Sequence, residues 1–111
     1  MDQTTAASPG LLRIHALTNP TGLRVHGEID MVTRPIWERA LAQVSANGET
    51  VHIECTGLSF IDVRGTSALM AAAQRLTANG GRLIVQAPPP SLTRILRTLW
   101  DGFPPIEVLP Q

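Results

Sequence analysis

The stretch 59–70, SFIDVRGTSALM, gathers side chains that could do chemistry: a carboxylate at Asp62, a guanidinium at Arg64, and hydroxyls at Thr66 and Ser67. A short apolar run precedes Asp62 and a helical pattern follows it, so these side chains fall at a strand-to-helix junction. Such junctions at the carboxyl edge of parallel strands are common binding positions in α/β sheets. Asp62 can also cap the helix through the free N–H groups of its first turn.

Arg64 and Gly65 fit a helix start poorly. Arg64 faces the positive end of the helix dipole, and Gly costs about 1 kcal/mol relative to Ala in a helix. Gly65 is better explained where the backbone lies close to another surface. Arg64 is either a harmless solvated side chain or a contact to an acidic or phosphate-bearing partner. The segment is therefore a candidate binding surface.

Three histidines fall on the polar side of neighbouring predicted strands, with two glutamates on the same side. The set is His15, His26, His52, Glu28 and Glu54. Either these residues form a metal cluster or they line a solvated sheet face. No two of the histidines have the i, i+2 or i, i+4 spacing typical of metal ligands, so we expect neither a metal nor a cofactor.

The remaining reactive side chains do not form a recognisable catalytic combination. Cys55 has apolar parity at a strand end, which is typical of a small buried hydrophobe. The glycine-rich NGGR, 79–82, follows a helix rather than preceding one, so it indicates a C-cap and not a phosphate loop. Ser67 has no base in its pattern and no carboxylates are paired at helical spacing. We expect no catalytic activity.

Composition narrows the class further. The chain has 111 residues and a formal net charge of zero, and all nine of its basic residues are arginine. A single domain with no net positive charge is not expected to attract nucleic acid or anionic lipid electrostatically. The single cysteine fits a reducing compartment, and no secretory signal or run of about 20 apolar residues is visible. A soluble cytoplasmic protein is expected.

Two alternating runs, 11–18 and 23–29, flank the turn residues NPTG and predict a β-hairpin. Residues 1–10 lack large hydrophobic side chains apart from Met1, so we expect a flexible tail followed by one domain over 11–111. After Asp30 the apolar period becomes helical, with Thr33 as a plausible N-cap.

The other predicted elements follow in strict alternation. They are a helix closed by 47–48, a strand at 50–55, a helix at 64–79 with Gly80 as C-cap, a strand at 82–87, a helix from Ser91 to 101–102, and a strand at 106–109. Strands joined through helices pair in parallel. The prediction is an α/β fold with a mixed sheet of four or five strands and three helices mainly on one face. Polar alternation in the first three strands leaves part of the other face in water.

The predicted core follows from the apolar stripes of these elements. It comprises Ile14, Val25, Trp37, Leu41, Val51, Ile53, Leu69, Leu76, Leu83, Val85, Ile95 and Leu99. Trp37 and Trp100 both fit packing positions, although Trp100 could instead belong to an exposed apolar patch used for self-association.

Three motifs in order resemble the STAS domain, the family of bacterial anti-sigma-factor antagonists, over about residues 11–109. GEID at 27–30 resembles the end of the family's second strand, and LSFIDVRGTSAL at 58–69 resembles its Asp-Ser-Ser-Gly segment. NGGRLIVQAPPPSLTRILRTL at 79–99 resembles its glycine-rich turn, fourth strand and third helix. The resemblance implies a protein-interaction module.

In that family, the second serine of the segment is phosphorylated by a GHKL-type anti-sigma kinase, and the unmodified protein captures the kinase and frees the sigma factor. Asp62 matches the family's Asp, Val63 its first Ser, Arg64 the phosphorylated Ser, and Gly65 its Gly. Arg64 has no hydroxyl, so the resemblance predicts no phosphorylation at the family position. Thr66 and Ser67 are the nearest substitutes for a displaced phosphosite.

The sequence therefore predicts a non-catalytic, partner-switching regulator of transcription that binds an anti-sigma factor or its kinase. The predicted partner surface comprises Asp30, Asp62, Val63, Arg64, Gly65, Thr66 and Ser67. Two alternatives stay open: an accessory subunit of a stressosome or a lipid-transport ABC complex, and a nucleotide sensor that holds phosphate with Arg64. Direct binding of nucleic acid and membrane insertion are not expected, and a homodimer is left open.

Overall fold

Strands and helices alternate along the chain in the order that the sequence predicts. The computed structural model describes residues 11–45, 48–100 and 106–110. Its elements are β2 (Arg13–Thr18), β3 (Thr21–Ile29), α1 (Arg34–Val44), β4 (Thr50–Ile61), α2 (Val63–Ala78), β5 (Arg82–Gln86), α3 (Pro90–Leu99) and β6 (Ile106–Leu109). The predicted tail at 1–10, Asn47 and the helix stop at 101–102 lie outside the described residues.

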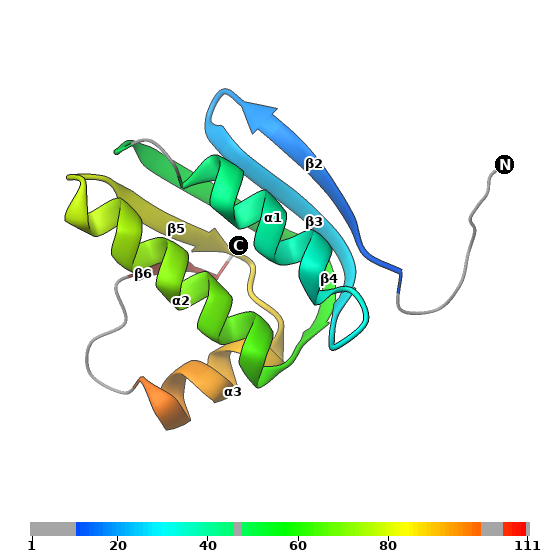
Figure 1. The fold of residues 1–111 in the computed structure, drawn as a ribbon. Helices are drawn as coiled ribbons and strands as arrows, with labels where there is room; N and C mark the ends of the chain where they lie inside the picture. Colours follow the sequence, from blue (N-terminus) through cyan, green and yellow to red (C-terminus); the bar gives the residue numbers. More distant parts are fainter. Residues whose placement is uncertain (1–10, 46–47, 101–105, 111) are drawn as a thin grey trace, which may run out of the picture.

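The strands form one mixed sheet in the order β2-β3-β4-β5-β6. β2 and β3 are an antiparallel hairpin, and every later neighbour pairs in parallel. α1 and α2 run side by side across one face of the sheet, and α3 lies near one end of it (Figure 1). The predicted α/β architecture is confirmed.

The core lies between the helices and the covered face of the sheet, and most of its predicted members are confirmed. Val25, Trp37, Leu41, Val51, Ile53, Leu69, Leu76, Leu83 and Val85 are all buried. Ile14 and Ile95 are half-buried. The prediction for Leu99 is wrong, because its side chain is 54% exposed. Leu99 lies in the last turn of α3, where the next residue, Trp100, packs against the core instead.

β4 is twice as long as the predicted strand at 50–55, since it continues without a break to Ile61. The pairing of β3 with β4 shifts register twice, once between Arg24 and His26 and once at Gly27. Gly27 has a φ of +111° at this irregularity, a conformation that favours glycine. The shifts let β4 follow β3 along its whole length, so both strands end at the same edge.

The other face of the sheet carries the predicted polar residues. His15 and Arg24 are exposed there, and His52 and Glu54 are half-buried. Within the described ranges, no group of three or more His, Cys, Asp and Glu side chains could hold a metal ion. No helix among the described residues is long and apolar enough to cross a membrane.

Candidate functional site

The ends of β3 and β4 bring two distant segments of the chain together. Ile29 pairs with Ile61, and the backbone N–H of Asp62 donates to the carbonyl oxygen of Ile29 at 3.0 Å. Asp30 and Asp62 therefore leave the same sheet edge on neighbouring strands. The turn after β3 leads into α1, and Asp62 leads directly into α2, so the first turns of both helices flank this edge.

Asp62 caps α2 as predicted. Its Oδ1 accepts the backbone N–H of Gly65 at 2.7 Å, and its Oδ2 lies 3.8 Å from Nη1 of Arg34. Arg34 also lies 3.7 Å from Glu38, one turn further along α1. The first turn of α2 thus already holds a carboxylate, and Arg34 is already shared between two acids. A phosphate at this helix start would meet the negative charge of Asp62, which weakens the nucleotide-sensor hypothesis.

Asp30 organises the turn that follows β3. Its Oδ1 accepts the backbone N–H groups of Val32 at 3.0 Å and Thr33 at 3.1 Å. The bond from Thr33 is the largest of the hydrogen bonds that lower the pKa of Asp30 below its usual value. Thr33 occupies the N-cap position, but the predicted side-chain cap is absent. Its hydroxyl instead donates to the carbonyl of Glu28 at 2.8 Å, so it fastens the turn to the strand.

Gly65 and Thr66 lie beneath the surface, contrary to their predicted place in a partner interface. A Cβ on Gly65 would lie 2.6 Å from Cγ2 of Ile29 and 2.9 Å from Cγ1 of Ile61. The close approach expected of Gly65 therefore exists, but it is to the core. Thr66 is fully buried, and its hydroxyl donates to the carbonyl of Asp62 at 2.9 Å. This burial conflicts with the hypothesis that Thr66 accepts phosphate.

Val63, Arg64 and Ser67 are the members of the predicted α2 segment that face solvent. Val63 and Arg64 line a shallow depression together with Met31, Arg34 and Asp62. Among the residues that the structure describes, no ion pair involves Arg64. Within this part of the chain, Arg64 is therefore a cation without an ion-pair partner, and it lines the depression.

Sequence reasoning missed several exposed apolar side chains at the same end of the sheet as Arg64. Met31 is 74% exposed and Val32 is 79% exposed, and Ile36 in the first turn of α1 is also exposed. Their exposure could have been predicted from the sequence. Met31 and Val32 precede α1, and Ile36 falls outside its buried stripe, which runs through Trp37 and Leu41. We define the strand-end surface as Met31, Val32, Ile36, Val63, Arg64 and Ser67.

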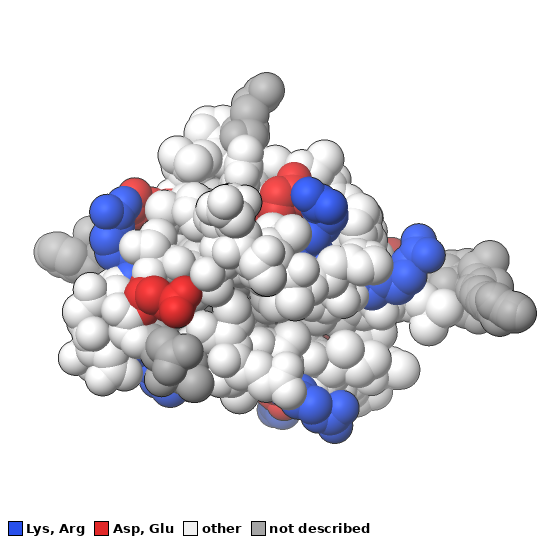
Figure 2. Space-filling view, turned by 90° about the horizontal axis from the view of Figure 1, so that it is seen from above, with Lys and Arg blue, Asp and Glu red and all other residues white. Residues whose placement is uncertain are grey.

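Charge elsewhere on the molecule is dispersed. In the view of Figure 2, Arg, Asp and Glu occur singly or in small mixed groups, with no broad patch of one sign. Ion pairs join Arg24 to Glu54 at 3.5 Å and Arg82 to Glu107 at 2.7 Å on the uncovered sheet face.

Cys55 and the histidines take no part in this site. Cys55 is 2% exposed, and burial, with a smaller contribution from Glu54, raises the pKa of its thiol to about 12. A thiol so rarely ionised is a poor nucleophile. His15 and His26 make an edge-on ring contact, with centroids 5.8 Å apart, on the hairpin.

Comparison with known proteins agrees with this geometry. A family model described as STAS domain matches residues 13–99. The structure is similar to that of an anti-sigma factor antagonist from Mycobacterium paratuberculosis, with a TM-score of 0.71 at 24% identity, covering 96% of this chain and 92% of that one. It is also similar to the anti-sigma factor antagonist SpoIIAA in its unphosphorylated form, with a TM-score of 0.64 at 18% identity, covering 89% of this chain and 87% of that one. Comparison with curated protein sequences gave no significant match.

Proposed function

Because the chain belongs to the STAS domain family, we propose that it is a non-catalytic partner-switching regulator of transcription. Its strand-end surface binds an anti-sigma factor, of the kind that is also a GHKL-type serine kinase. Two solved structures that share its fold are anti-sigma factor antagonists. This function implies a cytoplasmic location.

The exposed apolar side chains carry the proposal. Met31, Val32, Ile36 and Val63 are large hydrophobic residues between 47% and 79% exposed, and all four lie at one end of the sheet. Soluble monomers rarely leave such a patch without a partner. Arg64, which lines the same depression as Met31 and Val63, adds a cation that a carboxylate or phosphate on the partner would neutralise. The apolar contacts supply affinity, and the ion pair of Arg64 fixes the orientation of the bound partner.

Regulation at this surface differs from that of the family. Arg64 stands where the family carries its phosphorylated serine, and a guanidinium cannot be esterified by a kinase. Of the two neighbouring hydroxyls, Thr66 is buried and hydrogen-bonded, while Ser67 is exposed one helical turn after Arg64. The protein is therefore binding-competent by default, without a phospho-switch at the family position.

The test is affinity purification of the tagged protein from its native host, followed by mass spectrometry of the proteins that it retains. Wild type is expected to retain an anti-sigma factor, whereas Val63→Asp loses it because a carboxylate enters the apolar surface. An acidic residue in the first turn of a helix is favourable, so the fold should tolerate this change. Val108→Asp is the matched control, since Val108 is 40% exposed on β6, away from the strand-end surface.

The outcomes separate the alternatives. Retention of the same partner by Val63→Asp would show that the strand-end surface is not the interface. Recovery of stressosome or transporter subunits in place of an anti-sigma factor would favour the accessory-subunit reading. Calorimetric titration with GTP and ATP addresses the nucleotide sensor, for which we expect no heat of binding.

Phosphorylation needs its own measurement. The purified pair is incubated with ATP, and the protein is then analysed by intact-mass and peptide mass spectrometry. We expect no stoichiometric phosphate. Phosphate on Ser67 that releases the partner would overturn this expectation and show that the switch has moved by one helical turn.

A further inference from the structure

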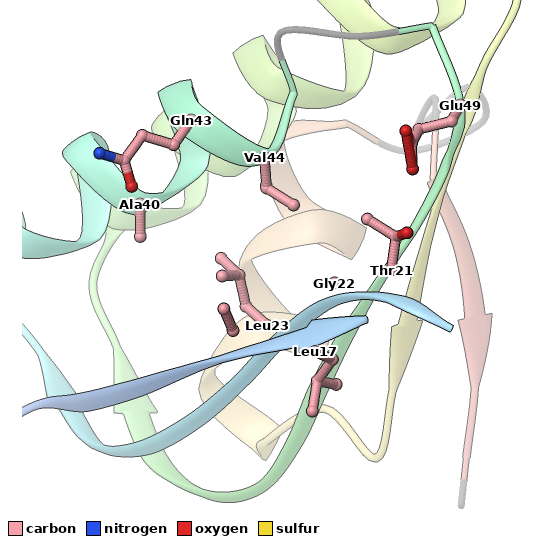
Figure 3. A pocket seen from close by; sticks show the side chains of 9 residues that line it. Leu17, Thr21, Gly22, Leu23, Ala40, Gln43, Val44 and Glu49 are labelled. Carbon is pink, nitrogen blue, oxygen red and sulfur yellow. The ribbon is translucent and has the colours of Figure 1, made fainter. Parts of the chain in front are cut away.

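A second concave site lies at the opposite end of the sheet from the strand-end surface. It is a groove between the C-terminal half of α1 and the β2–β3 hairpin, with a volume of about 260 Å³. Figure 3 shows Ala40 and Val44 on α1 above Leu23 on β3, with Thr21 and Glu49 at one end. Thr21 opens β3 and Glu49 immediately precedes β4. At about 3.3 Å per residue, nine-residue β3 separates the two sites by roughly 25 Å.

The groove exists because small side chains meet at the edge of the helix layer. α1 packs on β3, and β2 lies beyond it at the sheet edge (Figure 1). Ala16 on β2 is directly opposite Leu23, so it points to the same, helix-covered side of the sheet. Ala16 is nevertheless exposed, and Ala40 on α1 is only half-buried. Larger side chains at these two alanine positions would fill the space between α1 and the hairpin. With alanine there, the apolar bottom of the groove stays open.

The mouth of the groove carries a negative charge that forms no ion pair with any described residue. Glu49 is exposed, and no ion pair among the described residues involves it. Arg82 is its neighbour across the backbone, since the backbone N–H of Arg82 donates to the carbonyl oxygen of Glu49. The side chain of Arg82, however, pairs with Glu107 at 2.7 Å. A carboxylate and the Thr21 hydroxyl thus stand beside an apolar floor.

We propose that this groove binds a small organic amine, with its apolar body between Ala16, Leu23, Ala40 and Val44 and its ammonium group at Glu49. An ammonium group complements the charge of Glu49 and can donate to the Thr21 hydroxyl. The volume is just below the range of about 300–1,000 Å³ for drug-sized ligands, which suits a body of one ring. This site is independent of the proposed partner surface.

The test is NMR titration of the isotope-labelled full-length protein with benzylamine, and in parallel with benzyl alcohol and benzoate. These probes share one ring and differ in charge. Benzylamine is expected to shift the amide resonances of Ala16, Leu23 and Val44 in a saturable way, with weaker binding of the alcohol and none of the acid. Shifts elsewhere only, or equal binding of all three probes, would overturn the proposal.

Variants identify the two halves of the site. Glu49→Gln should weaken benzylamine binding about two- to five-fold, as expected for an exposed ion pair, and should leave the alcohol unaffected. Glu107→Gln removes the same charge from the other sheet face and should change neither. Ala16→Leu should abolish binding of both by filling the floor, and Ala40→Leu provides the same test from α1 if the first variant folds poorly. Undiminished binding to a folded Leu variant would refute the assignment.

Discussion

The indole Nε1 of Trp37 donates a buried hydrogen bond of 2.9 Å to the carbonyl oxygen of Gly65, a residue 28 positions later in the chain. The bond joins the first half of α1 to the first turn of α2. The ion pair between Arg34 and Asp62 joins the same two segments nearer the surface. Both helices that carry the strand-end surface are therefore fixed relative to each other.

Replacement of Trp37 by phenylalanine should destabilise the protein by roughly 2–3 kcal/mol. The change removes the donor to Gly65, leaves that carbonyl buried without its partner, and opens a cavity beneath α1. Urea denaturation followed by circular dichroism measures the difference. Trp100→Phe is the control, because Trp100 is only half-buried at the end of α3. Equal losses in the two variants would mean that the indole hydrogen bond contributes nothing particular.

Gly65→Ala should also destabilise, although alanine is the better helix former by about 1 kcal/mol. The added Cβ would lie within 3 Å of side-chain carbons of Ile29 and Ile61. Overpacking of this kind costs about 1–3 kcal/mol, so we expect a net loss. Ser67→Ala, at an exposed position in the same turn, should stay within about 0.5 kcal/mol of wild type in thermal and urea unfolding. If Gly65→Ala were more stable than wild type, the side chains of Ile29 and Ile61 would have to move aside at little cost.

Asp30 should give the turn a pH-dependent stability. Its folded-state pKa is lowered below the ordinary aspartate value of 3.8, chiefly by the hydrogen bond from the backbone N–H of Thr33. A lowered pKa means that the stabilisation is fully present above the unfolded value and is lost as pH falls through the folded value. Wild type should therefore exceed Asp30→Asn in stability at about pH 6, and the difference should shrink as pH falls below 3.8. Urea denaturation of both proteins at several pH values checks this, and a constant difference would contradict it.

Under the proposed function, Arg64→Glu should weaken binding of the partner by about 1–3 kcal/mol, because it reverses the charge that an acidic group of the partner would face. Arg94→Glu makes the same change on the exposed side of α3 and should have little effect. Isothermal titration calorimetry measures both. Binding of Arg64→Glu at wild-type affinity would make Arg64 a solvated residue outside the interface.

The fold was predictable because its apolar periods change cleanly at Asp30 and again at each later helix boundary. The Asp62 cap was predictable for a similar reason, since capping depends on residues three positions apart. What could not be predicted depends on long-range placement. The burial of Thr66 follows from the rotation of α2 against the sheet. The tightest contact of Gly65 is with Ile29, at the end of β3, which lies far from Gly65 in the sequence.

The length of β4 and the exposure of Leu99 have the same origin. Two register shifts against β3 carry β4 through to Ile61, and shifts of this kind have no periodic signature. Leu99 keeps the spacing of a buried stripe, but α3 ends there and Trp100 makes the contact instead. The apolar cluster around Met31 and Val32 was overlooked because it lies in a turn, where no stripe draws attention to it.

The exposed Arg64 offers no oxygen for a phosphoester, so under the proposed function the surface around it has no covalent off state. Capture of the partner would then follow mass action alone. At concentrations well above the Kd, each copy of the protein would sequester one copy of its partner, and free partner would accumulate only after its copies outnumber those of the protein. The transcriptional output would accordingly report the ratio in which two proteins are synthesised and degraded, with a threshold near equivalence.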